Sequence, residues 1–305
     1  MVGVFGRFAP SPTGELHLGN LRTAVVAWLS ARSTGSGFVV RMEDLDRHQS
    51  RSEHEQSQLH DLAALGLDWD GEVVRQSDRF ALYDDAIERL ATRGLVYECF
   101  CTRREIQLEI AESAAAPHGP PGSYPGTCRD LDDGARAAHL ASGRAPAVRL
   151  RSDRSLVTVH DRFAGDYEAI VDDVVLRRND GVPAYNLAVV VDDGVQAIEE
   201  VVRGDDLLSS TPRQVMLQHL LGFDTPTYMH IPLVMGADGE RLAKRHGAVT
   251  MRELDAAGVT SRDVLGWIGE SIGIAGTGER PTIDQLLTRY DPILVPRTPI
   301  DQPSL

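Results

Sequence analysis

The sequence predicts an α/β fold, built on a doubly wound parallel sheet with helices on both of its faces. Short apolar runs typical of buried strands alternate with helical periodicity along residues 2–94. Polar residues follow the predicted strands, where an open parallel sheet places its ligands. Neither a Gly-x-Gly-x-x-Gly motif nor a Walker-type loop follows the first strand, which disfavours dinucleotide-binding and P-loop proteins.

Breaks in the apolar spacing mark the first strands and helices. A strand at residues 2–5 is ended by the Pro/Gly turn of residues 10–14, and helical spacing resumes from about His17. Gly66 and Gly94 each follow a periodic stretch and act as helix stops. The elements expected next are a strand at residues 37–42, followed by acidic residues, and helices at about 52–65 and 78–90.

The junction between the first strand and the first helix is suited to an anion. A helix that begins near His17 turns its free backbone N–H groups and the positive end of its dipole toward the Pro/Gly turn. A nucleotide phosphate fits such a site. An ordinary strand-turn-helix corner gives the same pattern, so this stretch alone leaves both interpretations open.

A segment of mixed structure, residues 96–183, interrupts the alternation and is interpreted as an insertion. Its residues 179–181 form an Asn-Asp-Gly turn typical of a hairpin. The elements expected within it are a helix at 103–114, a Pro/Gly-rich loop at 116–126, and strands at 147–150, 156–160 and 174–178.

All three cysteines of the chain lie in this insertion. Cys99, Cys101 and Cys128 offer three soft ligands for a tetrahedral metal, for which zinc is the best match. The fourth ligand could be Tyr124, His118 or water. The alternative is three buried structural thiols, because free cysteine is often buried. A disulfide fits a cytoplasmic protein least well.

After the insertion the sheet resumes. Residues 185–193, whose middle part is apolar, are interpreted as a buried strand, and a strand at 198–202 leads into the polar segment 203–212. Pro212 suits the first turn of a helix that ends before Gly222. The remaining elements expected are a strand at 230–234 and helices at 251–256, 261–272 and 283–290.

Composition limits the classes of function. The formal charge of −14 at pH 7 argues against a generally basic nucleic-acid-binding surface, so an RNA partner would require local arginine clusters. No apolar run approaches the ~20 residues that a membrane span needs. The N-terminus carries no basic segment followed by an apolar stretch, and we therefore expect a cytoplasmic protein without a membrane span.

Lys244 is the only lysine among 31 Lys and Arg residues. An ammonium is a compact, flexible point charge that can follow a moving phosphate, whereas the planar guanidinium imposes its own geometry. The position is therefore interpreted as functional, with the survival of one lysine in an arginine-rich sequence as the alternative.

Several groups of residues, in this order, resemble the motifs of class I aminoacyl-tRNA synthetases of the glutamyl type. The resemblance covers about residues 4–274 and is carried by the blocks RFAPSPTG at 7–14, HLGN at 17–20, RMED at 41–44, Tyr185 with RGDD at 203–206, and RLAKR at 241–245. The blocks at 17–20 and 241–245 look like the first and second ATP-binding motifs of that family.

The resemblance is closest to a short branch of the family that transfers glutamate to the queuosine base in the anticodon loop of tRNA(Asp). It implies a class I synthetase Rossmann-like catalytic domain in two halves, residues 1–95 and 184–240. Residues 96–183 are then an inserted zinc-containing subdomain, with Cys99, Cys101, Tyr124 and Cys128 as the zinc ligands. Residues 241–305 would hold the Lys244 loop, a C-terminal helical stem-contact region and a tail, without an anticodon-binding domain. We expect a monomer.

The resemblance also implies the reaction. The α-carboxylate of glutamate attacks the α-phosphate of ATP, pyrophosphate leaves, and the glutamyl group passes from the adenylate to an acceptor hydroxyl. The implied catalytic residues are His17, Asn20 and Lys244, and the implied ATP-binding residues are His17, Gly19, Asn20, Asp205, Leu233 and Lys244. Mg²⁺ is expected to bridge the phosphates. Ala243 stands where the second motif often has serine, which predicts slower activation.

The glutamate site needs charges opposite to those of its substrate. Arg7 and Arg203 are the candidates for the carboxylates, because a guanidinium fork binds carboxylate in bidentate fashion, and Glu43 is the candidate for the α-ammonium. The full set implied is Arg7, Phe8, Ala9, Pro10, Ser11, Glu43, Tyr185 and Arg203. The alternatives are surface ion pairs for Arg203 and Glu43, and a core aromatic for Tyr185.

Three other functions remain in competition. The first is a truncated glutamyl-tRNA synthetase that charges the 3′ end of its tRNA. The second is a catalytically silent binding protein with a synthetase fold, against which the presence of His17, Glu43, Arg203 and Lys244 argues. The third is a related nucleotidyltransferase, which would not need the glutamate-type arginine and glutamate positions.

Overall fold

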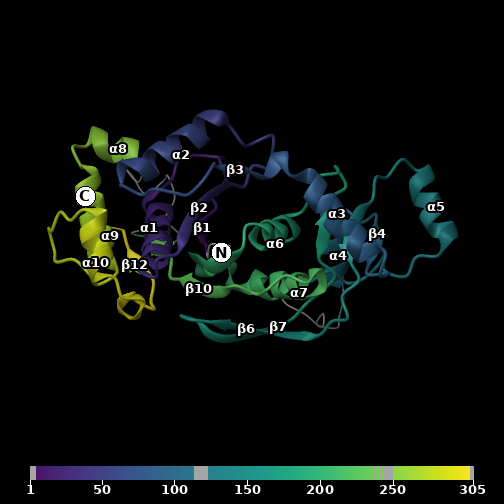
Figure 1. Ribbon diagram of the computed structural model, residues 1–305. Coiled ribbons are helices and arrows are strands. Elements are labelled where there is room, and N and C mark those ends of the chain that lie inside the picture. The colour runs from purple at the N-terminus through teal and green to yellow at the C-terminus, as the bar shows by residue number, and fades with distance from the viewer. Residues whose placement is uncertain (1–4, 113–122, 237, 241, 243–249, 303–305) are drawn as a thin grey trace.

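The computed structural model describes residues 5–112, 123–236, 238–240, 242 and 250–302 (Figure 1). Its strands are β1 Phe5–Phe8, β2 Gly37–Met42, β3 Val74–Arg75, β4 Val96–Cys99, β5 Ala147–Leu150, β6 Leu156–Asp161, β7 Gly165–Ile170, β8 Val175–Arg177, β9 Ile198–Gly204, β10 Thr227–Ile231, β11 Val234–Met235 and β12 Ile300–Asp301. Its α-helices are α1 Leu18–Ser33, α2 Ser52–Ala64, α3 Phe80–Ala91, α4 Arg103–Glu112, α5 Asp133–Ala141, α6 Tyr185–Val195, α7 Thr211–Leu221, α8 Met251–Ala256, α9 Ser261–Ser271 and α10 Ile283–Arg289. Short 3-10 helices are η1 Gln76–Asp78, η2 Asp205–Ser210 and η4 Pro292–Leu294.

The central sheet confirms the predicted α/β class. Its strand order is β3-β2-β1-β9-β10-β6-β7, and every neighbouring pair is parallel except β6 with β7. The chain leaves β1 for β2 on one side, whereas β9 lies on the other side of β1. This reversal of strand order is the switch point at which an open α/β sheet opens a crevice for its ligand. The carboxyl ends of β1, β2 and β9 therefore define where a site is expected.

Helix α1 supplies much of the main core. Its residues from Leu21 to Ala31 are largely buried, and they pack with apolar residues of β1, β2, β10 and the C-terminal helices α9 and α10. A second core cluster surrounds α6, which packs against α3 and α7. Figure 1 places α8, α9 and α10 at one end of the molecule and α4 and α5 at the other.

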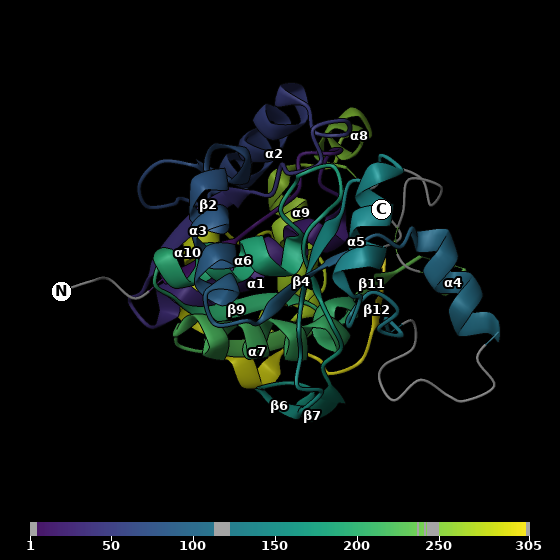
Figure 2. The same ribbon diagram turned by 90° about the vertical axis from the view of Figure 1, so that its right-hand side faces the viewer.

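The segment predicted as an insertion divides between two sheets. Strands β4, β5 and β8 form a separate antiparallel sheet of three strands. The hairpin β6–β7 instead joins the edge of the central sheet, where β6 pairs with β10. Figure 2, in which α4 and α5 face the viewer, shows this hairpin below the rest of the segment. The hairpin therefore brings residues of the segment next to the strands that carry the site.

The predicted strand at residues 185–193 is wrong, because these residues belong to helix α6, Tyr185–Val195. Residues 187–193 are all buried, so the run shows neither the period of a half-exposed helix nor that of a half-exposed strand. Its uniformly apolar part, residues 187–191, is too short to be assigned from periodicity alone. The expected hairpin after β8 is also limited to a single bridge, Arg177 with Pro183, because α6 begins at once.

Other boundaries shift by a few residues. The first strand is Phe5–Phe8 rather than 2–5, and residues 1–4 lie outside the described part of the chain. The predicted strand 230–234 is split between β10 and β11, and β11 pairs with β12. Helix α5 was not predicted, although its N-cap Asp132 accepts a hydrogen bond from the Ala135 N–H at 2.7 Å. None of the helices in the described ranges has the length and apolar character needed to span a bilayer.

Candidate active site

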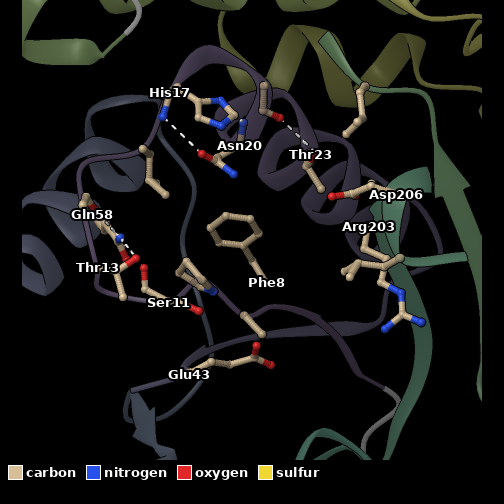
Figure 3. A pocket seen from close by; sticks show the side chains of 18 of the residues that line it. Phe8, Ser11, Thr13, His17, Asn20, Thr23, Glu43, Gln58, Arg203 and Asp206 are labelled. Atoms are coloured by element: carbon tan, nitrogen blue, oxygen red, sulfur yellow. Dashed lines mark hydrogen bonds between the residues drawn. The ribbon is translucent and has the colours of Figure 1, made fainter. Parts of the chain in front are cut away.

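A cavity of about 550 Å³ lies at the carboxyl ends of the central strands (Figure 3). Its volume is in the range of small-molecule sites. Arg7 and Phe8 end β1, Glu43 follows β2, and Arg203 ends β9 with Gly204. Twelve of the site residues named from the sequence line it: Arg7, Phe8, Ala9, Pro10, Ser11, His17, Gly19, Asn20, Glu43, Tyr185, Arg203 and Leu233.

Of the described residues named for ATP, Asp205 is absent from this lining. Asp206 lines the cavity, whereas Asp205 does not. Burial, with the neighbouring Asp206 carboxylate adding to it, raises the pKa of Asp205. Lys244 and the neighbouring Ala243 lie outside the described residues.

The start of α1 forms one wall of the cavity. His17 is the N-cap residue: its Nδ1 accepts from the Asn20 N–H at 3.3 Å, and its own N–H donates to Asn20 Oδ1 at 3.2 Å. This reciprocal capping box occupies the Asn20 N–H, while the N–H groups before it in the first turn are directed out of the helix. A Cβ on Gly19 would lie 3.0 Å from His17 Cε1, so glycine allows the imidazole to lie close to the helix start. The wall is therefore suited to an anion.

The Pro/Gly turn beside this wall is held by a residue that the sequence did not reveal. Gln58, in α2, is 1% exposed and donates from Nε2 to the Ser11 carbonyl at 3.0 Å and to the Gly14 carbonyl at 2.7 Å. The Glu43 N–H donates to the Pro10 carbonyl at 2.9 Å. The only sequence signal for Gln58 is a polar residue on the apolar side of a predicted helix.

Buried ion pairs support the end of β2. Arg41 is completely buried; its Nη2 lies 2.8 Å from Asp193 Oδ1 and 3.6 Å from Glu43 Oε1. Arg7 Nε lies 3.5 Å from the same Asp193 oxygen. Burial opposes ionisation of Asp193, but the Arg41 and Arg7 guanidiniums outweigh it and hold its pKa below the usual range. Burial raises the pKa of Glu43, although both arginines oppose this.

In Figure 3 Arg203 lies to the right of Glu43, and the Phe8 ring lies above Glu43. Arg203 is 5% exposed, and it makes no ion pair with a carboxylate of the described residues. Its Nη1 is buried and has no hydrogen-bond partner in the described ranges. Glu43 has a side chain only 10% exposed. The alternative of surface ion pairs is therefore wrong for both residues.

Tyr185 opens α6 and is 37% exposed. It lines the cavity, so the alternative of a core aromatic is wrong. A Cβ on Gly204 would lie 2.6 Å from Asp206 Oδ1 and 2.9 Å from Leu233 Cδ2, which explains glycine at this point. Other lining residues, which were not assigned a role from the sequence, are Thr13, Gly14, Glu15, Leu16, Thr23, Gln58, Val202, Asp206, Leu207 and Val234.

The three cysteines form a second cluster, and none of them lines this cavity. The sulfur atoms of Cys99, Cys101 and Cys128 all lie within 4.8 Å of one another. The Tyr124 hydroxyl is 3.4 Å from Cys99 Sγ and 3.5 Å from Cys101 Sγ, and it accepts from the Cys128 N–H at 2.8 Å. Hydrogen bonds from Cys101 and Tyr124 lower the pKa of the Cys99 thiol, although burial opposes this.

These donors fit a structural metal. Zinc bonded to thiolates at ~2.3 Å in a tetrahedron requires sulfurs nearly 4 Å apart, and Cys101 Sγ and Cys128 Sγ are 3.4 Å apart. Cys99 and Cys128 are buried, which is typical of a closed structural site. The predicted cluster is therefore confirmed as compatible with a metal. His118 lies outside the described residues.

The chemistry available in the cavity follows from its charges. Arg7 and Arg203 offer guanidinium N–H donors, the start of α1 offers backbone donors, and Glu43 offers a buried acceptor. Two anionic groups and one ammonium can thus be held together in one cavity. Positioning of this kind, with charge neutralisation, supplies most of the catalysis of phosphoryl or nucleotidyl transfer.

The sequence matches a known protein family. Residues 3–276 match the family model described as tRNA synthetases class I (E and Q), catalytic domain. The chain is 55% identical over 298 residues to a Glutamyl-Q tRNA(Asp) synthetase of Nocardia farcinica (strain IFM 10152), a match that covers 98% of this chain and 93% of the relative. It is 52% identical to the Glutamyl-Q tRNA(Asp) synthetase of Cutibacterium acnes (strain DSM 16379 / KPA171202) over 88% of this chain and 76% of the relative.

A solved structure has the same fold. The glutamate tRNA ligase from Elizabethkingia meningosepticum CCUG26117, crystallised in complex with its amino acid, superposes with a TM-score of 0.83 at 26% identity. The match covers 98% of this chain and 67% of that ligase.

Proposed function

The chain belongs to the class I Glu/Gln tRNA synthetase family, in its glutamyl-Q tRNA(Asp) synthetase branch, and we propose that it activates glutamate and glutamylates queuosine in tRNA(Asp). In the first step a glutamate α-carboxylate oxygen attacks the α-phosphorus of ATP, and the bond to pyrophosphate breaks. In the second step a hydroxyl of queuosine attacks the glutamyl carbonyl carbon and loses its proton, and AMP leaves.

One observation carries the glutamate half of this proposal. The cavity is lined both by the buried Glu43 carboxylate and by Arg203. The buried Nη1 of Arg203 has no hydrogen-bond partner among the described residues. A buried donor without a partner costs free energy, and a substrate carboxylate would recover it. In the proposal Arg7 and Arg203 bind the carboxylates of glutamate, Glu43 binds its ammonium, and Tyr185 adds a hydrogen bond from its hydroxyl. Phe8, Ala9, Pro10 and Ser11 form the adjoining wall.

ATP is proposed to bind against the start of α1. His17, Gly19 and Asn20 lie where the helix directs its N–H groups into the cavity, and Leu233 provides an apolar surface. His17 and Asn20 would donate to the phosphates, and Lys244 would neutralise the leaving pyrophosphate. Mg²⁺ would enter with ATP, held chiefly by phosphate oxygens and water. Asp205 is proposed to act from behind the lining, through the adjacent Asp206.

The cysteine cluster is proposed to hold one structural zinc ion, with Tyr124 as the fourth ligand beside Cys99, Cys101 and Cys128. The support is the contact of the Tyr124 oxygen with two of the sulfurs. Residues 96–183 are then proposed as the inserted segment that carries the zinc, between the two catalytic halves, residues 1–95 and 184–240. Residues 241–305 are proposed to supply the Lys244 loop, the helical region that contacts the tRNA stem, and a tail. The enzyme is proposed to act as a monomer in the cytoplasm.

The transfer assay tests the proposal against its rivals. The enzyme, ATP and labelled glutamate are incubated with queuosine-containing tRNA(Asp), with queuosine-lacking tRNA(Asp) and with tRNA(Glu). Labelling of the first tRNA alone is expected. Labelling of tRNA(Asp) with and without queuosine would overturn the acceptor assignment, and labelling of tRNA(Glu) would favour a synthetase that charges the 3′ end. Without glutamate-dependent ATP-pyrophosphate exchange, the chain would be a silent binding protein.

A further inference from the structure

We propose that Asp161 and His230 are positioning residues that hold Arg203 in the orientation in which it receives a substrate carboxylate. The inference rests on the proposed role of Arg203 in binding glutamate. Neither residue lines the cavity, and neither was named from the sequence.

Arg203 uses one edge of its guanidinium for the protein. Nε donates to His230 Nε2 at 2.9 Å, and Nη2 donates to Thr211 Oγ1 at 2.7 Å. Nη1 is left buried without a hydrogen-bond partner in the described part of the chain. Because Arg203 lines the cavity, the edge that remains is the one available to a ligand. The two partners therefore fix which donors of the arginine face a substrate.

The contact with His230 requires one particular tautomer. An arginine N–H can only donate, so His230 Nε2 must be an unprotonated acceptor. The ring proton then lies on Nδ1, which is 2.6 Å from Asp161 Oδ2. Burial lowers the pKa of His230, even though Asp161 opposes this, and so favours the neutral ring that the geometry needs. A protonated His230 would turn a second donor toward Arg203.

Asp161 is held as a carboxylate that only accepts. Its Oδ1 accepts from the Phe163 and Ala164 N–H groups, each at 2.8 Å, and its Oδ2 accepts from the His230 N–H at 3.1 Å. Both side chains of the Asp161–His230 pair are completely buried. Because every group that contacts the carboxylate is a donor, His230 must carry its ring proton on Nδ1.

The strand register delivers this chain of contacts. His230 in β10 is the register partner of Arg203 in β9, so their side chains lie side by side. Asp161 is the last residue of β6, and it is the register partner of Tyr228 in β10. The hairpin β6–β7 thus reaches the glutamate side of the cavity across one strand, although it belongs to the segment predicted as an insertion.

Three variants separate positioning from mere structural support. His230→Leu keeps an apolar volume but offers no acceptor, and should raise the KM for glutamate about 10-fold or more in ATP-pyrophosphate exchange, with the KM for ATP changed less than about 2-fold. His230→Gln places an amide oxygen near the position of Nε2 and should restore much of the glutamate affinity. Asp161→Asn can donate to Nδ1, which moves the ring proton to Nε2 against Arg203, and should resemble His230→Leu.

Two further measurements close the test. The ¹⁵N shifts of His230 in the whole protein should report the Nδ1–H tautomer in the wild type and a change in Asp161→Asn; a wild-type Nε2–H tautomer would overturn the proposal even if a variant folds poorly. The matched control is Asp166→Asn, because His160 Nδ1 and Asp166 form a similar 2.8 Å contact in the same hairpin but are 78% and 69% exposed. That variant should leave the glutamate KM unchanged.

The experiment distinguishes failure of the positioning role of Asp161 and His230 from failure of the proposed role of Arg203. Equal glutamate KM values for His230→Leu, Asp161→Asn and Asp166→Asn, alongside a raised value for Arg203→Ala, would overturn the positioning role alone. An unchanged glutamate KM in Arg203→Ala would instead overturn the proposed role of Arg203. Thermal melting of each variant verifies that the affinity is measured on folded protein.

Discussion

Arg41 and Glu43, two residues apart at the end of β2, form an ion pair of 3.6 Å in which the arginine is completely buried. The same guanidinium contacts Asp193 at 2.8 Å and lies 3.7 Å from Asp192. The Arg41 guanidinium thus contacts three carboxylates behind the proposed ammonium site, and Arg7 and Arg79 are further ion-pair partners of Asp193 and Asp192. Glu43 lines the cavity and Arg41 does not, so the arginine supports this carboxylate from behind the lining.

Arg41→Met should strongly destabilise the fold. It removes the shared cation and leaves Asp193 with only the more distant Arg7 as a charge partner. Breaking one side of a buried ion pair costs about 3–5 kcal/mol. Chemical denaturation monitored by circular dichroism should show a loss of this size in the free energy of unfolding.

The matched comparison for this variant is Arg75→Met. Arg75 pairs with Glu55, but its side chain is 43% exposed. An exposed pair contributes only about 0–1 kcal/mol. Similar losses in Arg41→Met and Arg75→Met would show that burial of the Arg41 network is not what stabilises this end of β2.

Much of the site was predictable because its residues follow strand ends. Arg7, Glu43 and Arg203 are far apart in the chain, yet each lies at the end of an apolar run, and parallel strands bring such ends to one edge. The turn before His17 was predictable for a related reason, since proline, glycine and a helix start occupy consecutive positions.

What could not be predicted depends on long-range packing. Residues 187–191 are uniformly apolar, and their packing as part of α6 against α3 and α7 is not visible in the sequence. Gln58 holds the Pro/Gly turn from 44 residues away, and Asp161 meets His230 across 69 residues. Polar residues in apolar surroundings are visible in a sequence, but their partners are not.

Ionisation of the buried Asp61 should lower the free energy of unfolding as the pH rises. It is 6% exposed in α2, and burial raises its pKa to about 6 from 3.8. Because the folded-state pKa lies above the unfolded one, Asp61 favours the folded state most below about pH 4, and this advantage is lost as the pH rises through 6. Asp61→Asn, which cannot ionise, should therefore gain stability relative to the wild type between pH 5 and pH 8, by up to about 3 kcal/mol.

Urea unfolding of both proteins at pH 5 and pH 8 measures this difference. The control is Asp255→Asn, at an exposed position in α8. A stability difference between Asp61→Asn and the wild type that is the same at both pH values would contradict the prediction.

We expect the cysteine cluster to bind zinc in the purified protein. Protein purified without added chelator should contain about one equivalent of zinc by elemental analysis, and Cys101→Ser should contain much less. Tyr124→Phe removes the hydroxyl that contacts Cys99 and Cys101, and should lower the zinc affinity without abolishing binding. Less than half an equivalent in the wild type would favour buried thiols, and unchanged affinity in Tyr124→Phe would leave water as the fourth ligand.

Lys244→Ala should slow activation more than it weakens glutamate binding. If the ammonium neutralises charge that develops on the departing pyrophosphate, it acts mainly in the transition state, and losing one such group costs about 10²- to 10³-fold in kcat. The KM for glutamate should change little, because the carboxylates are assigned to Arg7 and Arg203. Lys244→Arg keeps the charge but replaces a flexible point by a planar fork, and should recover only part of the rate. ATP-pyrophosphate exchange at varied glutamate concentration separates the two parameters. A raised glutamate KM with an unchanged kcat would place Lys244 on the amino acid rather than on the phosphates.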